Sequence, residues 1–259
     1  MSVSRQEQAR IDYDKSATVY NSYGLTPYGQ LESQLIEVAL GDCAGLSVLD
    51  LGGGTGIHAR EAIDLGASKV DVVDISGEML KIAEETARSQ GQQYENTIRY
   101  FEADVSKPLD NLPLQTEGYD VVMANWIFTF TDQVEVLEGM FHNIVGYLKP
   151  GGKFIGARDA GPRNLDLEKG KYGISCRDLE EIPGGLRYTC VIHSTPPMEW
   201  QSTSLEVIWS GSTELYEKAG LSDVKLVPYQ KAAIVQKDPD FWQPFLERPS
   251  QAVIQAVKK

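Results

Sequence analysis

The stretch that decides the fold is VLDLGGGTGIHAREAIDLGASKVDVVDIS, residues 48–76. It begins with an apolar run, passes through a group of glycines and, after a helix-length interval, ends a second apolar run at Asp74. Apolar runs rich in Val, Ile and Leu that flank a helix are typical of buried parallel strands. The stretch therefore predicts a strand, a helix and a second strand of one parallel sheet.

Strand-like and helix-like segments alternate along most of the chain. The expected strands cover residues 46–52, 69–75, 97–105, 119–128, 153–158, 223–229 and 250–259. This alternation predicts an α/β fold with a Rossmann-like, doubly wound, mostly parallel seven-stranded sheet. Helical spacing of apolar residues predicts two N-terminal helices, over residues 5–23 and 27–40, before the first strand.

The regular alternation stops between the fifth strand and the next helix. Residues 161–176 have the composition of a loop, and residues 186–194 and 203–209 resemble short strands. We expect this segment to cap the carboxyl edge of the sheet. The expected organisation is a single domain (1–259) with N-terminal helices (1–42), a ligand-binding half (43–158), a cap insertion (159–210) and a C-terminal helix and strands (211–259).

The composition limits the classes of partner. With 37 acidic and 24 basic residues, the formal net charge is −13, which repels nucleic acid and anionic membranes. No apolar stretch approaches the roughly 20 residues of a spanning helix, and residues 1–21 lack the apolar core of a secretory signal. The three cysteines form no CxxC pair. We expect a cytoplasmic monomer or weak dimer with neither a nucleic-acid nor a membrane partner.

A strand that turns through glycines into a helix brings backbone N–H groups close to a ligand, because no Cβ obstructs the approach. Gly52, Gly54 and Gly56 fit such a loop. Their spacing departs from the GxGxxG of dinucleotide-binding enzymes, whose third glycine would fall at Ile57. The sequence also lacks a Tyr-x-x-x-Lys pair, so an NAD-dependent oxidoreductase is disfavoured.

Two acidic residues indicate what the glycine loop holds. Asp50 directly precedes the glycines and disfavours a pyrophosphate, because negative charges would meet there. Asp74 ends the second strand, where a carboxylate accepts hydrogen bonds from both hydroxyls of a ribose. The pattern indicates a nucleoside that carries a positively charged group.

Five elements of the sequence resemble, in order, the motifs of class I S-adenosylmethionine-dependent methyltransferases. They are DLGGGTG at residues 50–56, Asp74 after VDVV, EADV at 102–105, YDVVMAN at 119–125 and LKPGGKF at 148–154. The resemblance covers residues 10–156 and implies S-adenosylmethionine as the cofactor. The cofactor-binding residues that it implies are Tyr13, Tyr20, Asp50, Gly52, Gly54, Gly56, Asp74, Ile75, Asp104, Val105 and Asn125.

The resemblance also implies individual roles. Asp74 would bind the ribose hydroxyls, Ile75 would pack on the adenine, and Asp104 would accept a hydrogen bond from the adenine amino group. Asn125 would lie beside the methionine portion. An alternative for Asn125 is a helix cap.

The N-terminal segment YDKSATVYN, residues 13–21, resembles the tyrosine-containing helix that closes over the cofactor in small-molecule methyltransferases. The resemblance implies that Tyr13 and Tyr20 contact the cofactor's carboxylate or surround the methyl group. The alternative is that both tyrosines are packing residues of an amphipathic helix.

Methyl transfer from a sulfonium is an in-line displacement, so alignment and exclusion of water supply much of the acceleration. A base matters for a neutral hydroxyl and less for a thiol, whose pKa of about 8.5 leaves a few per cent ionised. The candidate bases are His193 in the cap and Asp159 at the end of the fifth strand, whereas His58 and His142 are expected to be structural. No carboxylate cluster suggests chelation, so we expect no metal.

Aromatic and apolar residues in the cap favour a hydrophobic small-molecule acceptor. The tyrosine-rich N-terminus, the cap and residues 238–259 are similar to fungal secondary-metabolite methyltransferases. Across its whole length the chain most resembles the gliotoxin-type dithiol S-methyltransferases, which implies S-methylation of a reduced epidithiodiketopiperazine such as dithiol gliotoxin. The alternatives are an O-methyltransferase of phenolic or polyketide metabolites and a cofactor-binding protein without catalysis.

Overall fold

The structure is a computed structural model that describes residues 4–165 and 169–259. Residues 166–168, within the stretch expected to be a loop, lie outside the described residues. Two helices come first, α1 (Arg5–Tyr20) and α2 (Pro27–Leu40), joined by a 3-10 helix (Asn21–Leu25). The side chains of Ser4 and Thr26 accept backbone N–H groups at their first turns, which satisfies donors that a helix leaves free. The expected N-terminal helices are thus present.

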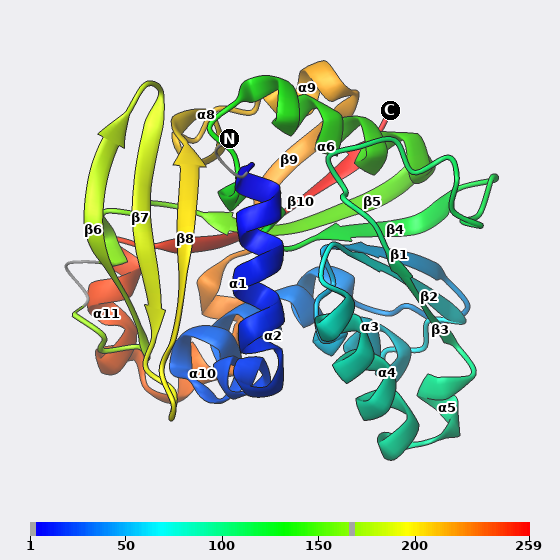
Figure 1. Cartoon of the computed structure of the whole chain (residues 1–259), viewed down its shortest axis with the longest axis horizontal. Helices are drawn as coiled ribbons and strands as arrows, with labels where there is room; N and C mark the ends of the chain where they lie inside the picture. Colours follow the sequence, from blue (N-terminus) through cyan, green and yellow to red (C-terminus); the bar gives the residue numbers. More distant parts are fainter. Residues whose placement is uncertain (1–3, 166–168) are drawn as a thin grey trace.

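The main sheet has seven strands in the order β3-β2-β1-β4-β5-β10-β9 (Figure 1). They are β1 (Ser47–Leu51), β2 (Lys69–Asp74), β3 (Ile98–Glu102), β4 (Tyr119–Ala124), β5 (Leu148–Asp159), β9 (Leu221–Leu226) and β10 (Gln251–Lys258). Only β10 is antiparallel to its neighbours, β5 and β9. The predicted Rossmann-like, mostly parallel, seven-stranded sheet is confirmed.

Helices cover both faces of this sheet, so its strands bury side chains on both sides. Along β4, Val121 and Met123 pack in one apolar cluster, whereas Val122 and Ala124 pack in the other. The helices on the first face are α2, α3 (Ile57–Asp64) and α4 (Gly77–Gln90), and those on the second are α6 (Val134–Tyr147) and α9 (Glu214–Ala219). Further helices are α5 (Gln92–Glu95), α10 (Ala233–Lys237) and α11 (Pro239–Glu247).

The strand order reverses between β1 and β4. The chain runs outward from β1 to β2 and β3, and then returns to the other side of β1 as β4. In open α/β sheets a crevice forms at the carboxyl ends of the strands at such a point. The glycine loop after β1 and the segment after β4 therefore flank the place where a ligand is expected.

A second sheet stands beside the first and differs from the expected cap. It has three antiparallel strands, β6 (Ile174–Ile182), β7 (Gly185–Ile192) and β8 (Met198–Leu205), with α1 lying between it and α4 (Figure 1). The expectation of a loop over residues 161–176 is wrong from Ile174 onward. The expected strand over residues 203–209 ends at Leu205, where the Glu206 N–H bonds to the Gly184 carbonyl and α8 (Glu206–Trp209) begins.

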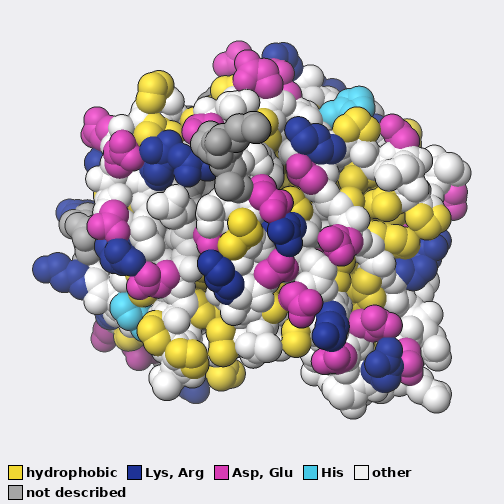
Figure 2. Space-filling model, viewed as in Figure 1, with side chains coloured by type: hydrophobic (Ala, Val, Ile, Leu, Met, Phe, Trp, Pro, Cys, Tyr) yellow, Lys and Arg dark blue, Asp and Glu magenta, His cyan; other side chains and the backbone are white. Residues whose placement is uncertain are grey.

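On the face shown in Figure 2, basic and acidic side chains are interspersed over α1. Arg10, for example, pairs with both Glu7 and Asp14 along this helix.

Among the residues that the structure describes, no helix combines the length and the apolar character needed to cross a membrane.

Candidate active site

The loop after β1 is built on glycine geometry. Gly52 and Gly54 have φ values of 74° and 52°, in the left-handed region that other residues rarely adopt. A Cβ at Gly52 would lie 2.3 Å from the Ile127 side chain, and one at Gly53 would lie 2.7 Å from the Asp50 carboxylate. The loop therefore forms only with glycines, which leave its backbone open toward the crevice.

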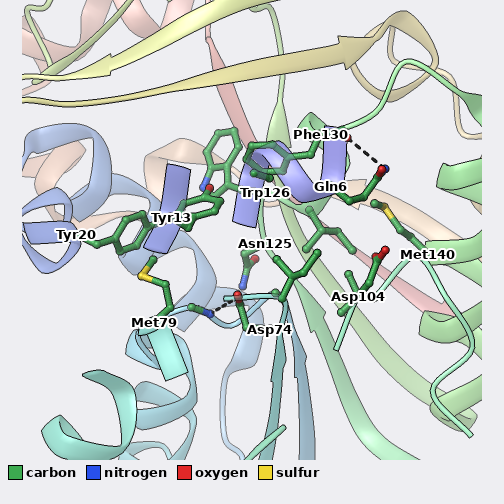
Figure 3. Close-up of a pocket in the computed structure, with 16 residues that line it drawn as sticks. Gln6, Tyr13, Tyr20, Asp74, Met79, Asp104, Asn125, Trp126, Phe130 and Met140 are labelled. Atoms are coloured by element: carbon green, nitrogen blue, oxygen red, sulfur yellow. Dashed lines mark hydrogen bonds between the residues drawn. The ribbon is translucent and has the colours of Figure 1, made fainter. Parts of the chain in front are cut away.

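Asp74, at the end of β2, holds this loop in place. One carboxylate oxygen accepts the Gly54 N–H at 2.8 Å (Figure 3), and the other accepts the Ser76 N–H at 2.8 Å. Burial raises the pKa of the Asp74 carboxyl to about 6, although these backbone donors oppose the change. At neutral pH Asp74 is thus mainly a buried carboxylate that has spare lone pairs for ligand hydroxyls.

The central cavity lies between the glycine loop, α4, α1 and the segment after β4 (Figure 3). It brings together most of the residues that the motifs implied, namely Tyr13, Tyr20, Gly52, Gly54, Asp74, Ile75, Asp104, Val105 and Asn125. The wall also contains residues that sequence reasoning missed, namely Gln6, Ala9, Met79, Trp126, Ile127, Phe130 and Met140. The missed residues are mostly apolar and carry no motif that distinguishes them from core residues.

Asp50 and Gly56 do not line the central cavity. The Asp50 side chain is fully buried beneath Gly53, and within the described ranges neither of its carboxylate oxygens has a hydrogen-bond partner. Burial raises the pKa of its carboxyl to about 6. Gly56 precedes α3 with a φ of 70°. Both residues lie behind the loop, away from the central cavity. Their positions therefore do not support the expectation that they contact the ligand directly.

Asn125 follows β4 at the back of the central cavity. Its Oδ1 accepts the Ala157 N–H of β5 at 2.9 Å, which fixes the orientation of the amide. Its Nδ2 is buried and finds no partner in the part of the chain that the structure describes. A buried unpaired donor is costly, so this amide is available to a ligand oxygen.

Helix α1 covers the central cavity with its tyrosines. The Tyr13 ring lies 5.7 Å from Tyr20, 5.6 Å from Phe130 and 5.9 Å from Trp200. The Ser76 hydroxyl donates to Asp14 at 2.6 Å, which ties α1 to the start of α4. The helix thus lies between the central cavity and the three-stranded sheet.

A second cavity, the cap cavity, lies under the three-stranded sheet. Tyr13, Tyr20 and Trp126 belong to the walls of both the central and the cap cavity, so they form the boundary between the two. The other lining residues are Tyr23, Tyr28, Thr129, Asp159, Leu165, Ile174, Tyr188, Cys190, Trp200 and Ser202. Aromatic rings dominate this wall, as is typical of pockets for small molecules.

Asp159 provides a buried carboxyl group in the cap cavity. It is 1% exposed, and the Tyr188 hydroxyl lies 3.1 and 3.0 Å from its two oxygens. Burial raises the pKa of this carboxyl to about 6, although the hydrogen bond from Tyr188 opposes the change. The predicted candidate base therefore faces the cavity in which an acceptor would lie.

His193 does not reach these cavities, which corrects its candidacy as a base. It follows β7 at the surface, where its Nε2 lies 2.9 Å from the Ser175 hydroxyl. Alternation along β7 explains the error, because Tyr188 and Cys190 point inward and the odd-numbered positions point outward. His142 is likewise exposed, on α6.

His58 lies in a third cavity, the loop cavity, behind the glycine loop and beside α2. Its Nδ1 is 2.7 Å from Glu61 and its Nε2 is 3.3 Å from Glu32. Burial would lower the pKa of the imidazole, but the two carboxylates raise it well above its ordinary value. The two carboxylates therefore favour the protonated form of His58, which joins α2 to α3.

The fold and the central cavity define a class, and comparison with known proteins agrees with it. Residues 48–152 match the family described as a methyltransferase domain. The fold is that of solved S-adenosylmethionine-dependent methyltransferases.

Individual relatives resemble the chain to different extents. An S-adenosylmethionine-dependent methyltransferase from Mesorhizobium loti aligns with a TM-score of 0.59 at 20% identity, over 90% of this chain and 100% of that one. The DhpI–SAM–HEP complex aligns with a TM-score of 0.62 at 16% identity, over 99% of both chains. At these identities the likeness shows the fold alone.

Curated relatives are similar over part of their length only. The chain is 27% identical to squalestatin tetraketide synthase clz2 of Cochliobolus lunatus over 49% of this chain and 5% of that protein. It is 35% identical to phosphoethanolamine N-methyltransferase 1 of Triticum aestivum over 42% and 20%, respectively. It is 32% identical to the C-methyltransferase UbiE of Idiomarina loihiensis over 44% of both. The chain spans less than half of these relatives, and the family match ends before the cap.

Proposed function

We propose that the protein is an S-adenosylmethionine-dependent methyltransferase that methylates a thiol of a small, largely apolar acceptor. The observation that carries this proposal is the common boundary of the two cavities. Tyr13, Tyr20 and Trp126 separate a cavity suited to the cofactor from an aromatic cavity that contains a buried carboxyl group. A group transferred between the two ligands would cross this boundary.

The central cavity fits the cofactor in its chemistry. When bound, the cofactor supplies a methyl group on a positively charged sulfur. Asp74 would accept the ribose hydroxyls, Asp104 would accept from the adenine amino group, and the unpaired Nδ2 of Asn125 would donate to an oxygen of the amino-acid portion. The glycine loop leaves space for the ligand, because a Cβ there would be too close to its neighbours.

The acceptor's proton would pass to Asp159, and the cost of this step favours a thiol. With a carboxyl pKa of about 6, Asp159 takes a proton from a thiol of pKa about 8.5 at a cost of roughly 3 kcal/mol. The same transfer from a phenol of pKa about 10 costs roughly 5 kcal/mol. The carboxylate of Asp159 is thus a sufficient base for a thiol and a weak one for a phenol.

The test is mass spectrometry of reactions with S-adenosylmethionine and two panels of acceptors, reduced cyclic dithiols such as dithiol gliotoxin and phenols of similar size. We expect methylation of the dithiols. Methylation confined to the phenols would contradict the thiol proposal and favour the O-methyl alternative. The absence of methylation in both panels, with S-adenosylhomocysteine still bound, would favour a cofactor-binding protein without catalysis.

The variant Asp159→Asn separates the role of the base from binding. We expect it to lower kcat with a phenol much more than with a thiol, because a thiol ionises by itself near neutral pH. Asp120→Asn is the matched control, since Asp120 pairs with Lys149 away from both cavities. Equal losses for both acceptors would contradict a role for Asp159 as base.

A further inference from the structure

Trp126 has a backbone conformation that tryptophan rarely adopts. Its φ of 63° and ψ of 4° lie in the left-handed region, directly after β4. Two hydrogen bonds hold the residue there: its N–H donates to the Ala157 carbonyl at 2.9 Å, and its carbonyl accepts the Thr129 hydroxyl at 2.8 Å. An unfavourable conformation that the surroundings enforce is common at functional sites.

This backbone directs the indole ring to the meeting point of the cavities. Trp126 lines the central, cap and loop cavities, and its ring stacks on Tyr28 at 6.2 Å with an interplanar angle of 27°. Figure 3 shows the indole beside Tyr13, above Asn125 and Asp74. The stacking restricts the ring, so the direction of its N–H group is restricted as well.

The indole Nε1 is buried and, as far as the described residues go, has no hydrogen-bond partner. The indole nitrogens of Trp209 and Trp242 share this property, but neither residue lines any of the three cavities. An unpaired buried donor on a residue that lines a cavity differs from one in the core, because a ligand in that cavity can come close enough to accept its hydrogen bond.

Trp126 and Asp159 offer complementary groups to one ligand. Both residues line the cap cavity, whereas Asn125, whose amide nitrogen is also unpaired, lines the central and loop cavities. They come from the carboxyl ends of neighbouring strands, since the Trp126 N–H bonds to Ala157, two residues before Asp159. The wall of the cap cavity therefore includes one residue with an unpaired buried donor and one with a buried acceptor.

We propose that Trp126 is a specificity-determining residue whose Nε1–H donates a hydrogen bond to the methyl acceptor. The acceptor's thiol or hydroxyl faces Asp159, and a neighbouring lone-pair atom of the same molecule, such as a carbonyl oxygen, binds Trp126. The substrate class is thus a small molecule that carries a carbonyl group beside its nucleophile. This inference rests on the proposed function.

The experiment compares positional isomers that have the same functional groups. The first pair is 2-mercaptobenzamide and 4-mercaptobenzamide, and the second is salicylamide and 4-hydroxybenzamide. The ortho isomers place a carbonyl within reach of Trp126 when the nucleophile faces Asp159, whereas the para isomers do not. For the native protein we expect about a tenfold higher kcat/KM with the ortho isomer, the value of one hydrogen bond.

The variant Trp126→Phe retains an aromatic ring and removes the N–H group. We expect it to lose the ortho preference and to bind S-adenosylhomocysteine as the native protein does, measured by calorimetry. The matched control is Trp242→Phe, which removes an unpaired buried indole N–H from the core and leaves the preference unchanged.

Three results would overturn the inference. They are equal kcat/KM values for ortho and para isomers in the native protein, an ortho preference that persists in Trp126→Phe, and a loss of S-adenosylhomocysteine affinity in that variant. The isomer comparison needs no variant, so it decides the question even if Trp126→Phe fails to fold. Failure of the proposed function is distinguishable, because neither isomer of mercaptobenzamide would then be methylated.

Discussion

Three buried carboxyl groups dominate the chemistry at the scale of single residues. Asp50, Asp74 and Asp159 stand at the carboxyl ends of β1, β2 and β5, and burial raises the pKa of each to about 6. Their neighbours differ: Asp74 accepts two backbone N–H groups, and Asp159 accepts a tyrosine hydroxyl. We therefore expect the same substitution to have different consequences at the three positions.

Asp74→Ala should weaken the binding of S-adenosylhomocysteine about a hundredfold. The ribose would lose two charge-assisted hydrogen bonds, and the glycine loop would lose the acceptor of its Gly54 N–H. Calorimetric titration measures the change, with Asp74→Asn as the control that retains one acceptor oxygen. An unchanged affinity in a folded Asp74→Ala variant would refute the assignment of the ribose site.

Asp50→Asn should stabilise the protein at pH 7.5 by about 3 kcal/mol. The pKa of Asp50 is higher in the folded state than in the unfolded chain, so the cost of ionising it in the fold is fully present above about pH 6. This cost disappears as the pH falls toward 4, and the gain from the substitution should disappear with it. Urea unfolding at pH 7.5 and 4.5 measures both values.

Asp120→Asn is the control, because the expected change in stability at pH 7.5 has the opposite sign. Although partial burial acts in the other direction, the hydrogen bond from Lys149 holds the pKa of the Asp120 carboxyl below its ordinary value. Its ionised form therefore contributes stability above the unfolded pKa, and this contribution is lost as the pH falls. The substitution should destabilise the protein at pH 7.5. If Asp50→Asn raised the free energy of unfolding equally at both pH values, the change could not come from the ionisation of Asp50.

At the scale of elements, sequence patterns predicted the main sheet well and the cap poorly. The central strands β1, β2 and β4 are short, mostly buried runs, and β1 pairs with both of its neighbours without a shift of register. In β6 the period is interrupted, because Asp178 has a φ of 55° and the register with β7 shifts between Arg177 and Glu180. A bulge of this kind obscures the alternation on which strand prediction depends.

The helices α8 and α11 illustrate two other reasons for a missed element. Residues 206–209, EVIW, favour a strand by composition, but a tertiary hydrogen bond to Gly184 ends the ladder and the chain turns into a helix. For α11 a signal was present, since Asp238 caps the helix and Pro239 occupies its first turn. Pro244, inside the helix, makes the sequence look unfavourable for a helix, because proline usually ends or kinks one.

Helix α1 should be locally unstable until the cofactor binds. Only Ala9 and Ala17 of this helix are buried, so little apolar packing holds it over the central cavity. We expect its amides to exchange rapidly with solvent in the free protein and severalfold more slowly with S-adenosylhomocysteine bound. Hydrogen exchange with mass detection measures both states, and α6 serves as the internal control. Equal protection of α1 in both states would show that it is not part of the cofactor site.

At the scale of the whole molecule, the glycine-loop half and the cap cavity differ in how well the sequence predicts their residues. The cofactor half depends on backbone geometry that only glycine provides, as at Gly52 and Gly54, so its residues form a contiguous pattern. The cap cavity is built from side chains that are distant in sequence, such as Tyr28, Asp159 and Trp200. No sequence spacing distinguishes these residues from others in the chain. For this reason the sequence offers the buried Asp159 and the exposed His193 equally as candidate bases, and it gives no signal for Trp126.

Turnover should not require a divalent metal. Across residues 4–165 and 169–259, no group of three or more His, Cys, Asp or Glu side chains is placed to hold a metal ion. We expect EDTA to leave the rate of methylation unchanged and added magnesium to have no effect. A loss of rate in EDTA that magnesium restores would contradict this expectation.

The position of α1 across both cavities has a consequence for the kinetics of the catalytic cycle. Because Tyr13 and Tyr20 belong to the walls of both cavities, a movement of this one helix would open the two cavities at the same time. If the cavities hold cofactor and acceptor as proposed, loading and product release would be coupled through a single opening event. The order of addition of the two substrates, and inhibition by the spent cofactor, would thus depend on how often one helix of 16 residues lifts from the sheet.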